Sequence, residues 1–326
     1  YMIDATAKPE DLKKQLLHDL ASWYAPPVLS ETMIGAKVVV DSDCEGLLPD
    51  GSDCQEPGPT CHCGPNLSGA QVAALKEAID TFGAKEKVLF FFSYNEDSFV
   101  AAADAGATVH LGGPLVNFPT ACPPPPWGGA VRFGMLCNQT IISHLASKGV
   151  SWLSLQSNYG GNIKTFLETS YSSSGAPRPE GAFFREQSFV QRLTPAELNG
   201  YETMAKLYAK GDSIATAFKQ NRGDELFDMN AKALRLAKAA NMSILAAEDA
   251  GSIWAVQGNM PLEAAYLSPS VLTPMETIVA MTSAPAKAAK LDHLVGTLAA
   301  GKRADLVIPA ADPLLHASNV GRIVDV

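Results

Sequence analysis

The sequence predicts an α/β protein in which helices alternate with short apolar strands of a parallel sheet. Apolar runs such as Val88–Ser93 have no polar face, which is typical of strands buried on both sides. Segments with helical spacing separate these runs, as in Ser68–Phe82, where Val72, Leu75 and Ile79 fall on one face. Five such strand and helix repeats fit part of a (β/α)8 barrel of the TIM type.

The individual elements follow from the same patterns. The predicted strands are Ala36–Val40, Val88–Ser93, Ala107–Leu111, Val150–Gln156 and Ser243–Glu248. The predicted helices are Pro9–Tyr24, Ser68–Phe82, Asn95–Ala105, Asn138–Ser147, Pro195–Tyr208, Asp224–Ala240 and Pro274–Ala289. A doubly wound open sheet is the alternative, but no Gly-x-Gly-x-x-Gly follows a strand and no Gly-Lys-Ser/Thr loop exists. Two last strands, Ala304–Pro309 and Arg322–Val326, lie outside the repeat, so we expect a small separate β-domain there.

Composition excludes several classes of protein. The 326 residues are 47% hydrophobic and 18% charged, which is typical of a globular chain and not of a disordered one. The net charge of −9 and the absence of a Lys/Arg cluster argue against a nucleic-acid partner. Apolar runs are far shorter than the roughly 18–20 residues of a membrane helix, so we expect no membrane partner. Tyr1 has no leader before it and the last strand stops at Val326, so we expect a fragment or a processed chain.

The cysteines bear on the cellular compartment. They fall in two loop regions: Cys44, Cys54, Cys61 and Cys63 in the first, and Cys122 and Cys137 around a proline run in the second. Disulfides that pin the two loops are one interpretation and fit an oxidising compartment. Free thiols and a zinc knot at Cys61-His62-Cys63 are the alternatives, although zinc prefers Cys pairs with wider spacing. Glycosylation motifs at Asn66, Asn138 and Asn241 add to the expectation of a secreted glycoprotein.

Two ordered stretches near the C-terminus resemble a known family. LTPMETIVAMTSAPA, which begins at Leu272, is followed by VGTLAAGKRADLV, which begins at Val295. Together they are similar to the end of an amidohydrolase-superfamily enzyme, in the imidazolonepropionase-like and prolidase-like branch. In that family such a helix closes the barrel, and the second stretch returns the chain to a β-sandwich. The resemblance implies a barrel over residues 1–295, with loop insertions near 41–67, 112–136 and 157–193, and a partial sandwich over 296–326.

The resemblance also implies site residues. The run AAEDAG stands where the family has Gly-Thr-Asp-Ala-Gly at the end of the eighth strand, so Asp249 takes the place of the aspartate that binds metal and shuttles protons. The run GATVHL resembles the segment into the sixth strand, with His110 as the metal ligand. The run GAKVVV resembles the fourth strand, whose carboxylated lysine bridges two metals, which implicates Lys37. Plain structural roles are the alternative for all three, as a helix cap, a strand-end histidine and a solvent-facing or ion-paired lysine.

Two features depart from the family pattern. The predicted fifth strand ends Phe92-Ser-Tyr94 where the family has His-Ala-(His/Tyr), so Phe92 replaces a metal-binding histidine. The His-x-His of the first strand is absent. We therefore expect an incomplete barrel that holds strands four to eight. A second chain, a missing segment or a homo-oligomer would complete it, because open sheet edges are prone to aggregation.

The resemblance implies a hydrolase that acts on amide or peptide-type C–N bonds of a small molecule or peptide. One or two divalent metals, zinc being the first expectation, would lower the pKa of a bound water. Asp249 would take the proton of this water and pass it to the leaving group. The alternative is a catalytically inactive pseudoenzyme that serves binding or assembly, because Phe92 and the missing His-x-His weaken the metal site.

Overall fold

The structure, a computed structural model, divides into two compact units. It describes residues 7–23, 35–40, 44–45, 62–63, 67–82, 88–93, 96–110, 115–116, 134–178, 195–249, 258 and 260–325. The first unit comprises Tyr1–Leu153, Ala233–Leu245 and Thr282–Ala304. The second unit comprises Ser154–Lys232, Ala246–Met281 and Asp305–Val326. Each unit therefore joins segments that are distant in the sequence, and the domain boundary predicted after residue 295 stays a prediction.

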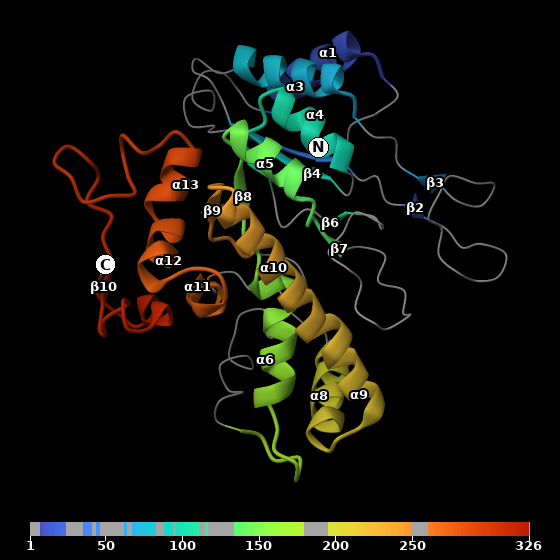
Figure 1. Cartoon of the computed structure of the whole chain (residues 1–326), viewed down its shortest axis with the longest axis vertical. Helices are drawn as coiled ribbons and strands as arrows, with labels where there is room; N and C mark the ends of the chain where they lie inside the picture. Colours follow the sequence, from blue (N-terminus) through green and yellow to red (C-terminus); the bar gives the residue numbers. More distant parts are fainter. Residues whose placement is uncertain are drawn as a thin grey trace. The chain divides into compact units, whose positions relative to one another are not determined.

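A five-stranded parallel sheet is the central element of the first unit (Figure 1). Its strands are β1 (Gly35–Val40), β4 (Val88–Ser93), β5 (Val109–His110), β8 (Ser151–Leu153) and β9 (Ser243–Leu245). They lie side by side in chain order, and every neighbouring pair is parallel. Parallel neighbours in chain order are the arrangement that strand and helix repeats produce. The parallel sheet expected from the sequence is therefore confirmed.

Apolar side chains bury both faces of this sheet. The helices of the first unit are α1 (Pro9–Trp23), α3 (Gly69–Phe82), α4 (Glu96–Asp104), α5 (Gln139–Ser147) and α13 (Ser283–Ala288). Phe91 of β4 packs edge to face on Phe99 of α4, with ring centroids 5.9 Å apart. On the opposite face, Val88 and Leu245 pack with Ala284 of α13. Burial on both faces explains why these strands are continuous apolar runs.

Local sequence signals determine where several helices begin and end. Before α3, the backbone N–H of Gln71 donates to Ser68 Oγ (3.3 Å), and Gln71 Oε1 accepts from the backbone N–H of Ser68 (2.8 Å). This reciprocal pair is a capping box. Asn138 caps α5 by accepting from two backbone N–H groups of the first turn. Gly106 follows α4 with a φ of 95°, a conformation that glycine adopts without steric cost.

The second unit is mainly helical. Its elements are η1 (Ser157–Gly161), α6 (Asn162–Thr169), α8 (Pro195–Ala209), α9 (Ser213–Lys219), η4 (Gln220–Asp224), α11 (Met260–Ser270), α12 (Pro274–Met281) and η5 (Ala317–Gly321). The long helix α10 (Glu225–Ala239) begins in this unit and ends in the first. Ile163 and Phe166 of α6 pack in one apolar cluster with Ala205 of α8. The sequence predicts a loop insertion near 157–193, but residues 162–169 of it form α6, in which Ile163, Phe166 and Leu167 recur at helical spacing.

The single helix predicted over Pro274–Ala289 is broken in the structure. α12 ends at Met281, Thr282 has φ −128° and ψ −86°, and α13 begins at Ser283. Pro285 explains the break. In a continuous helix the ring of this proline would clash with the carbonyl group of Met281, four residues earlier.

A short antiparallel pair lies near the C-terminus, in the second unit. β10 (Ile308–Pro309) pairs with β11 (Ile323–Asp325), so both strands expected there exist. Ile308, Ile323 and Val324 are 52%, 52% and 64% exposed, so this pair does not bury its apolar side chains within the unit. The partial β-sandwich expected over 296–326 stays a prediction.

Two other pairs of short strands are antiparallel. β2 (Cys44–Glu45) pairs with β3 (His62–Cys63), and β6 (Leu115–Val116) pairs with β7 (Gly134–Met135). Both pairs fall within regions where the sequence predicts long loops. Among the residues that the structure describes, no helix has the length and apolar character needed to cross a bilayer.

Candidate active site around Asp249

Asp249 lies shortly after the end of β9, and its side chain is exposed. Its φ of 49° is in the left-handed region, which costs most residues about 1–2 kcal/mol and which Asp tolerates better than most. The carboxylate accepts a hydrogen bond from Asn158, whose Nδ2 is 3.4 Å from Asp249 Oδ2. Backbone strain of this kind is concentrated at functional sites. Asp249 is therefore both accessible to a substrate and oriented by a neighbour.

Asn158 is positioned by the tight packing of η1. Gly160 in this segment has a φ of 95°, and a Cβ atom at this position would lie 2.2 Å from the carbonyl oxygen of Gly223 in η4. A Cβ atom on Gly161 would lie 2.8 Å from the ring of Tyr266 in α11. Only glycine fits these two positions, because η1 packs closely against both η4 and α11.

The turn that joins β8 to η1 is buried and polar. Ser154, Gln156 and Ser157 are fully buried. Leu155, between them, has a φ of 47°, a conformation that brings the Cβ of leucine close to the following carbonyl oxygen. This residue also explains why β8 ends at Leu153, although the sequence predicts a strand as far as Gln156. Surrounding contacts must hold such a turn.

Glu263 of α11 supplies those contacts. Its Oε1 accepts hydrogen bonds from Ser154 Oγ and from the backbone N–H of Gln156 (2.9 Å), and its Oε2 accepts from the backbone N–H of Ser157 (2.6 Å). Burial raises the pKa of Glu263, and the hydrogen bonds from these three residues act against that shift. The sequence analysis missed Glu263. The available signal was a single acidic residue in the apolar run MPLEAAYL, which begins at Met260.

The other predicted site residues lie in the sheet of the first unit. Lys37 of β1 is in register with Phe90, and His110 of β5 is in register with Phe91. Consecutive residues of a strand belong to opposite faces of a sheet, so the register puts Lys37 and His110 in rows of opposite faces. Phe92 is in register with Val39, at the carboxyl end of β4. The side chains of Lys37, His110 and Phe92 are outside the described part of the structure, so their roles stay predictions.

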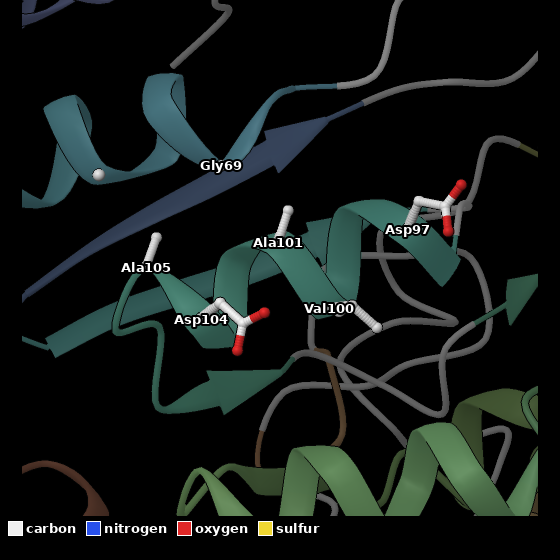
Figure 2. A pocket seen from close by; sticks show the side chains of 7 residues that line it. Gly69, Asp97, Val100, Ala101, Asp104 and Ala105 are labelled. Carbon is white, nitrogen blue, oxygen red and sulfur yellow. The ribbon is translucent and has the colours of Figure 1, made fainter.

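An open groove of about 470 Å³ lies between α3 and α4 in the first unit. Figure 2 shows that Val100 and Ala101 of α4 and Ala105, which follows α4, line it together with the carboxylates of Asp97 and Asp104. Lys148 and His144 contact Asp104, and the hydrogen bond from Lys148 is the main reason why the pKa of Asp104 is lowered. The groove contains none of the predicted site residues.

Comparison with known proteins identifies the family. The amidohydrolase family profile matches residues 161–325, which is half of the chain and includes Asp249. The chain belongs to the amidohydrolase family. The family expected from the C-terminal motifs is therefore confirmed. No curated protein matches this amidohydrolase.

Solved structures with low sequence identity share the fold of this amidohydrolase. An Xaa-Pro dipeptidase with methionine bound in its active site has a TM-score of 0.55 at 14% identity, over 99% of this chain and 58% of that chain. A putative prolidase from Bifidobacterium longum has a TM-score of 0.53 at 14% identity, over 97% of this chain and 57% of that chain. These likenesses show an α/β fold of the TIM-barrel type. The chain spans somewhat more than half the length of the structures that it matches.

Amidohydrolases generally use divalent metals, so we asked whether the described residues fit one. Among the side chains that the structure describes, no three His, Cys, Asp or Glu residues lie together as a metal-binding group. Asp249 offers one hard carboxylate ligand, whereas zinc sites normally use three or more protein ligands. The described residues therefore do not form a metal site by themselves.

Proposed function

We propose that this amidohydrolase hydrolyses amide or peptide-type C–N bonds and that Asp249 carries the proton in the reaction. One observation carries the proposal. Asp249 is exposed, has a left-handed φ of 49° and is hydrogen-bonded to Asn158. The run AAEDAG around it resembles the family run that holds a proton-shuttling aspartate. The names of two structural neighbours, an Xaa-Pro dipeptidase and a putative prolidase, favour dipeptides that end in proline as the first substrates to test.

In the proposed chemistry Asp249 accepts a proton and later donates it. Water attacks the carbonyl carbon of the substrate amide, and the carboxylate takes one proton from this water as the C–O bond forms. The same carboxyl group then gives the proton to the leaving nitrogen as the C–N bond breaks. General base and acid catalysis of this kind contributes about 10²- to 10⁴-fold to the rate. The hydrogen bond from Asn158 favours one orientation of the carboxylate during both transfers.

A metal is part of this proposal, although the described residues supply too few ligands for one. In the family, a divalent ion such as zinc lowers the pKa of the attacking water. We propose that Asp249 contributes a ligand for one or two ions together with His110 or a carboxylated Lys37, because the register puts the last two in rows of opposite faces of the sheet. Further ligands would come from polypeptide outside the described residues, because Phe92 occupies a family histidine position and the first-strand His-x-His is absent.

A second polypeptide or a further segment of this one is proposed to complete the barrel. The chain covers 58% and 57% of two of its structural neighbours. In the described sheet, β1 and β9 are the outermost strands and pair on one side only. Unpaired strand edges readily pair with additional chains. A homo-oligomer is the other way to cover these edges.

We also propose that the protein is a secreted, disulfide-bonded glycoprotein. The register of β2 with β3 puts Cys44 opposite Cys63, a spacing that suits a cross-strand disulfide. No cysteine among the described residues is free. Asn241, the acceptor residue of a glycosylation motif, is exposed after the end of α10. Mass spectrometry with and without reduction and deglycosylation would detect both modifications, and a sample with six free thiols and no glycan would contradict this proposal.

The experiment combines metal analysis with an activity assay. The whole protein, with any polypeptide that copurifies, is assayed by elemental analysis and by hydrolysis of Ala-Pro and other dipeptides, with and without added zinc. We expect divalent metal in the purified protein and hydrolysis that a chelator abolishes. Less than about 0.2 metal ions per chain, together with no hydrolysis after zinc addition, would contradict the proposal, since the proposed site needs one or two ions per chain.

A pseudoenzyme is the second candidate. The observation that favours it is Phe92, which lies at the carboxyl end of β4 where the family has a metal-binding histidine. A pseudoenzyme would remain folded, would bind zinc weakly and would hydrolyse none of the dipeptides under any of these conditions. The same assay therefore separates the two candidates.

A further inference from the structure

Glu263 is a buried carboxylate that the proposed reaction does not use. It has 0% exposed surface, so neither substrate nor solvent reaches it. Burial of a carboxyl group is costly unless hydrogen-bond donors surround it. Ser154 Oγ and the backbone N–H groups of Gln156 and Ser157 all donate hydrogen bonds to it. An ionised carboxylate satisfies such a set, because it only accepts hydrogen bonds.

The same turn receives a second brace from α10. Asn230 Nδ2 donates to the carbonyl oxygen of Ser154 (2.8 Å) and to Gln156 Oε1 (2.6 Å). These contacts leave Leu155 with its left-handed φ of 47° in the middle of the turn. A leucine does not prefer this conformation, so the hydrogen bonds determine the shape of the turn. Glu263 and Asn230 together therefore hold the segment between β8 and η1.

Two links lead from this turn to Asp249. Ser154 Oγ, which donates to Glu263, accepts from the backbone N–H of Ala247 at 3.3 Å, two residues before Asp249 in the chain. Ser157, which donates to the other oxygen of Glu263, is followed directly by Asn158, the hydrogen-bond donor to Asp249. The first link holds the backbone that carries Asp249. The second link holds the group that orients its carboxylate.

We infer that Glu263 is a positioning residue for Asp249. Glu263 fixes the turn of residues 154–157. Through Ser154 the turn holds the backbone at Ala247, and through Ser157 it holds Asn158, the donor to Asp249. This inference rests on the proposed function, because it gives Glu263 a part in the reaction only if Asp249 carries the proton. Glu263 itself touches no substrate, since it is buried.

Glu263→Gln is the most informative variant. Glutamine has nearly the same shape, but an NH2 group replaces one acceptor oxygen. This NH2 group faces a hydrogen-bond donor and repels it. The matched control is Thr277→Val, which removes another hydrogen bond of a fully buried side chain, from Thr277 Oγ1 to the carbonyl oxygen of Thr273 (3.0 Å), between residues that do not belong to this turn. Kinetics with Ala-Pro are measured for the whole protein in both variants, in Asp249→Asn and in the double variant Glu263→Gln/Asp249→Asn.

The expected pattern is a kcat effect that depends on Asp249. Glu263→Gln should lower kcat by about 10- to 100-fold with little change in KM, because small misplacements of catalytic groups have effects of this size. In the Asp249→Asn background the same substitution should change kcat by less than about twofold, since the two residues act as one unit. Thr277→Val should keep the kcat of the unsubstituted protein.

Three results would overturn the inference, and a fourth would overturn the proposed function. The inference fails if Glu263→Gln keeps kcat close to that of Thr277→Val, or if its effect multiplies with that of Asp249→Asn. Hydrogen exchange at the amides of Gln156 and Ser157 should also be faster in Glu263→Gln, and unchanged exchange would count against the inference without any activity assay. If Asp249→Asn alone retains full activity, the proposed function fails first.

Discussion

The sheet around Phe91 and the turn around Glu263 are both fully buried, but different interactions stabilise them. Phe91 packs against the ring of Phe99, and its neighbours in β4 bury apolar surface on both faces. The turn after β8 instead buries hydroxyl, amide and carboxylate groups and keeps Leu155 in a left-handed conformation. Apolar packing tolerates small adjustments, whereas a buried polar group that loses its hydrogen-bond partner is costly. The first region therefore depends on close apolar contact, and the second depends on buried hydrogen bonds to one carboxylate.

The largest expected effect on stability is in the sheet. Phe91→Ala should lower the free energy of unfolding by about 3–5 kcal/mol, because it leaves a cavity under α4. Urea denaturation measures this loss. Leu298→Ala is the control, because Leu298 is 85% exposed; it should change the free energy of unfolding by less than about 0.5 kcal/mol. Equal losses in the two variants would contradict the apolar core described for the sheet.

The next effect tests the polar network. Glu263→Ala should cost about 2–4 kcal/mol of unfolding free energy, since it leaves three buried donors without their acceptor. Glu276→Ala is the control, because Glu276 is also a glutamate that accepts from a backbone N–H and a hydroxyl, but at the exposed start of α12. It should cost about 1 kcal/mol or less. If urea denaturation shows that the two substitutions lower the free energy of unfolding by the same amount, burial does not explain the contribution of Glu263 to stability.

A smaller effect tests the packing of η1. Gly160→Ala should lower the free energy of unfolding by about 1–3 kcal/mol, because its Cβ atom would overlap the backbone of Gly223. Gly211→Ala is the matched control, since Gly211 also has a positive φ, 79°, but has nothing within 4 Å of an added Cβ. Backbone strain alone should cost it about 1 kcal/mol. Equal melting temperatures for the two variants would show that η1 and η4 can move apart without loss of stability.

The smallest effect concerns pH and an ion-pair cluster of the second unit. Asp224 pairs with Lys219 and Lys164, both at 2.9 Å. Burial acts to raise the pKa of Asp224, but hydrogen bonds from the two lysines outweigh it, so the pKa lies below its ordinary value of 3.8. A carboxyl group with a lowered pKa in the folded state stabilises the fold above its ordinary value, and this stabilisation is lost as the pH falls through the folded value.

Asp224→Asn is the variant that tests this pH dependence. At pH 7 it should melt about 1–3 °C below the unsubstituted protein, and the difference should shrink as the pH falls below about 4. Differential scanning calorimetry at pH 7 and at pH 3 measures both values. Asp292→Asn, at an exposed position, should show little difference at either pH. A difference that grows towards low pH would contradict the sign derived for Asp224.

The sequence was sufficient for the elements of the sheet because each signal is local. Alternating apolar strands and helices predicted β4, α3 and α5 within one or two residues, and Asn138 and Gly106 fixed helix ends through their own backbone preferences. The break at Thr282 was also local, since Pro285 excludes a continuous helix, but the apolar periodicity hid it.

The candidate site was only partly predictable. Asp249 was predicted because the short run AAEDAG around it resembles a family motif. Glu263 was not, because its partners lie more than 100 residues earlier in the chain and only the folded chain brings them together. Asn158 was missed for the same reason, since its partner Asp249 is 91 residues away.

The central claim is that Asp249 carries the proton during hydrolysis, and one measurement tests it most directly. Asp249→Asn keeps the size of the side chain and removes its basicity, and the exposed position makes a loss of folding unexpected. The turnover of Ala-Pro by the whole, zinc-supplemented protein is compared with and without this substitution. We predict a loss in kcat of about 10²- to 10⁴-fold with an unchanged melting temperature. A kcat within about twofold of the unsubstituted protein would contradict the account, since removing a general base has a much larger effect.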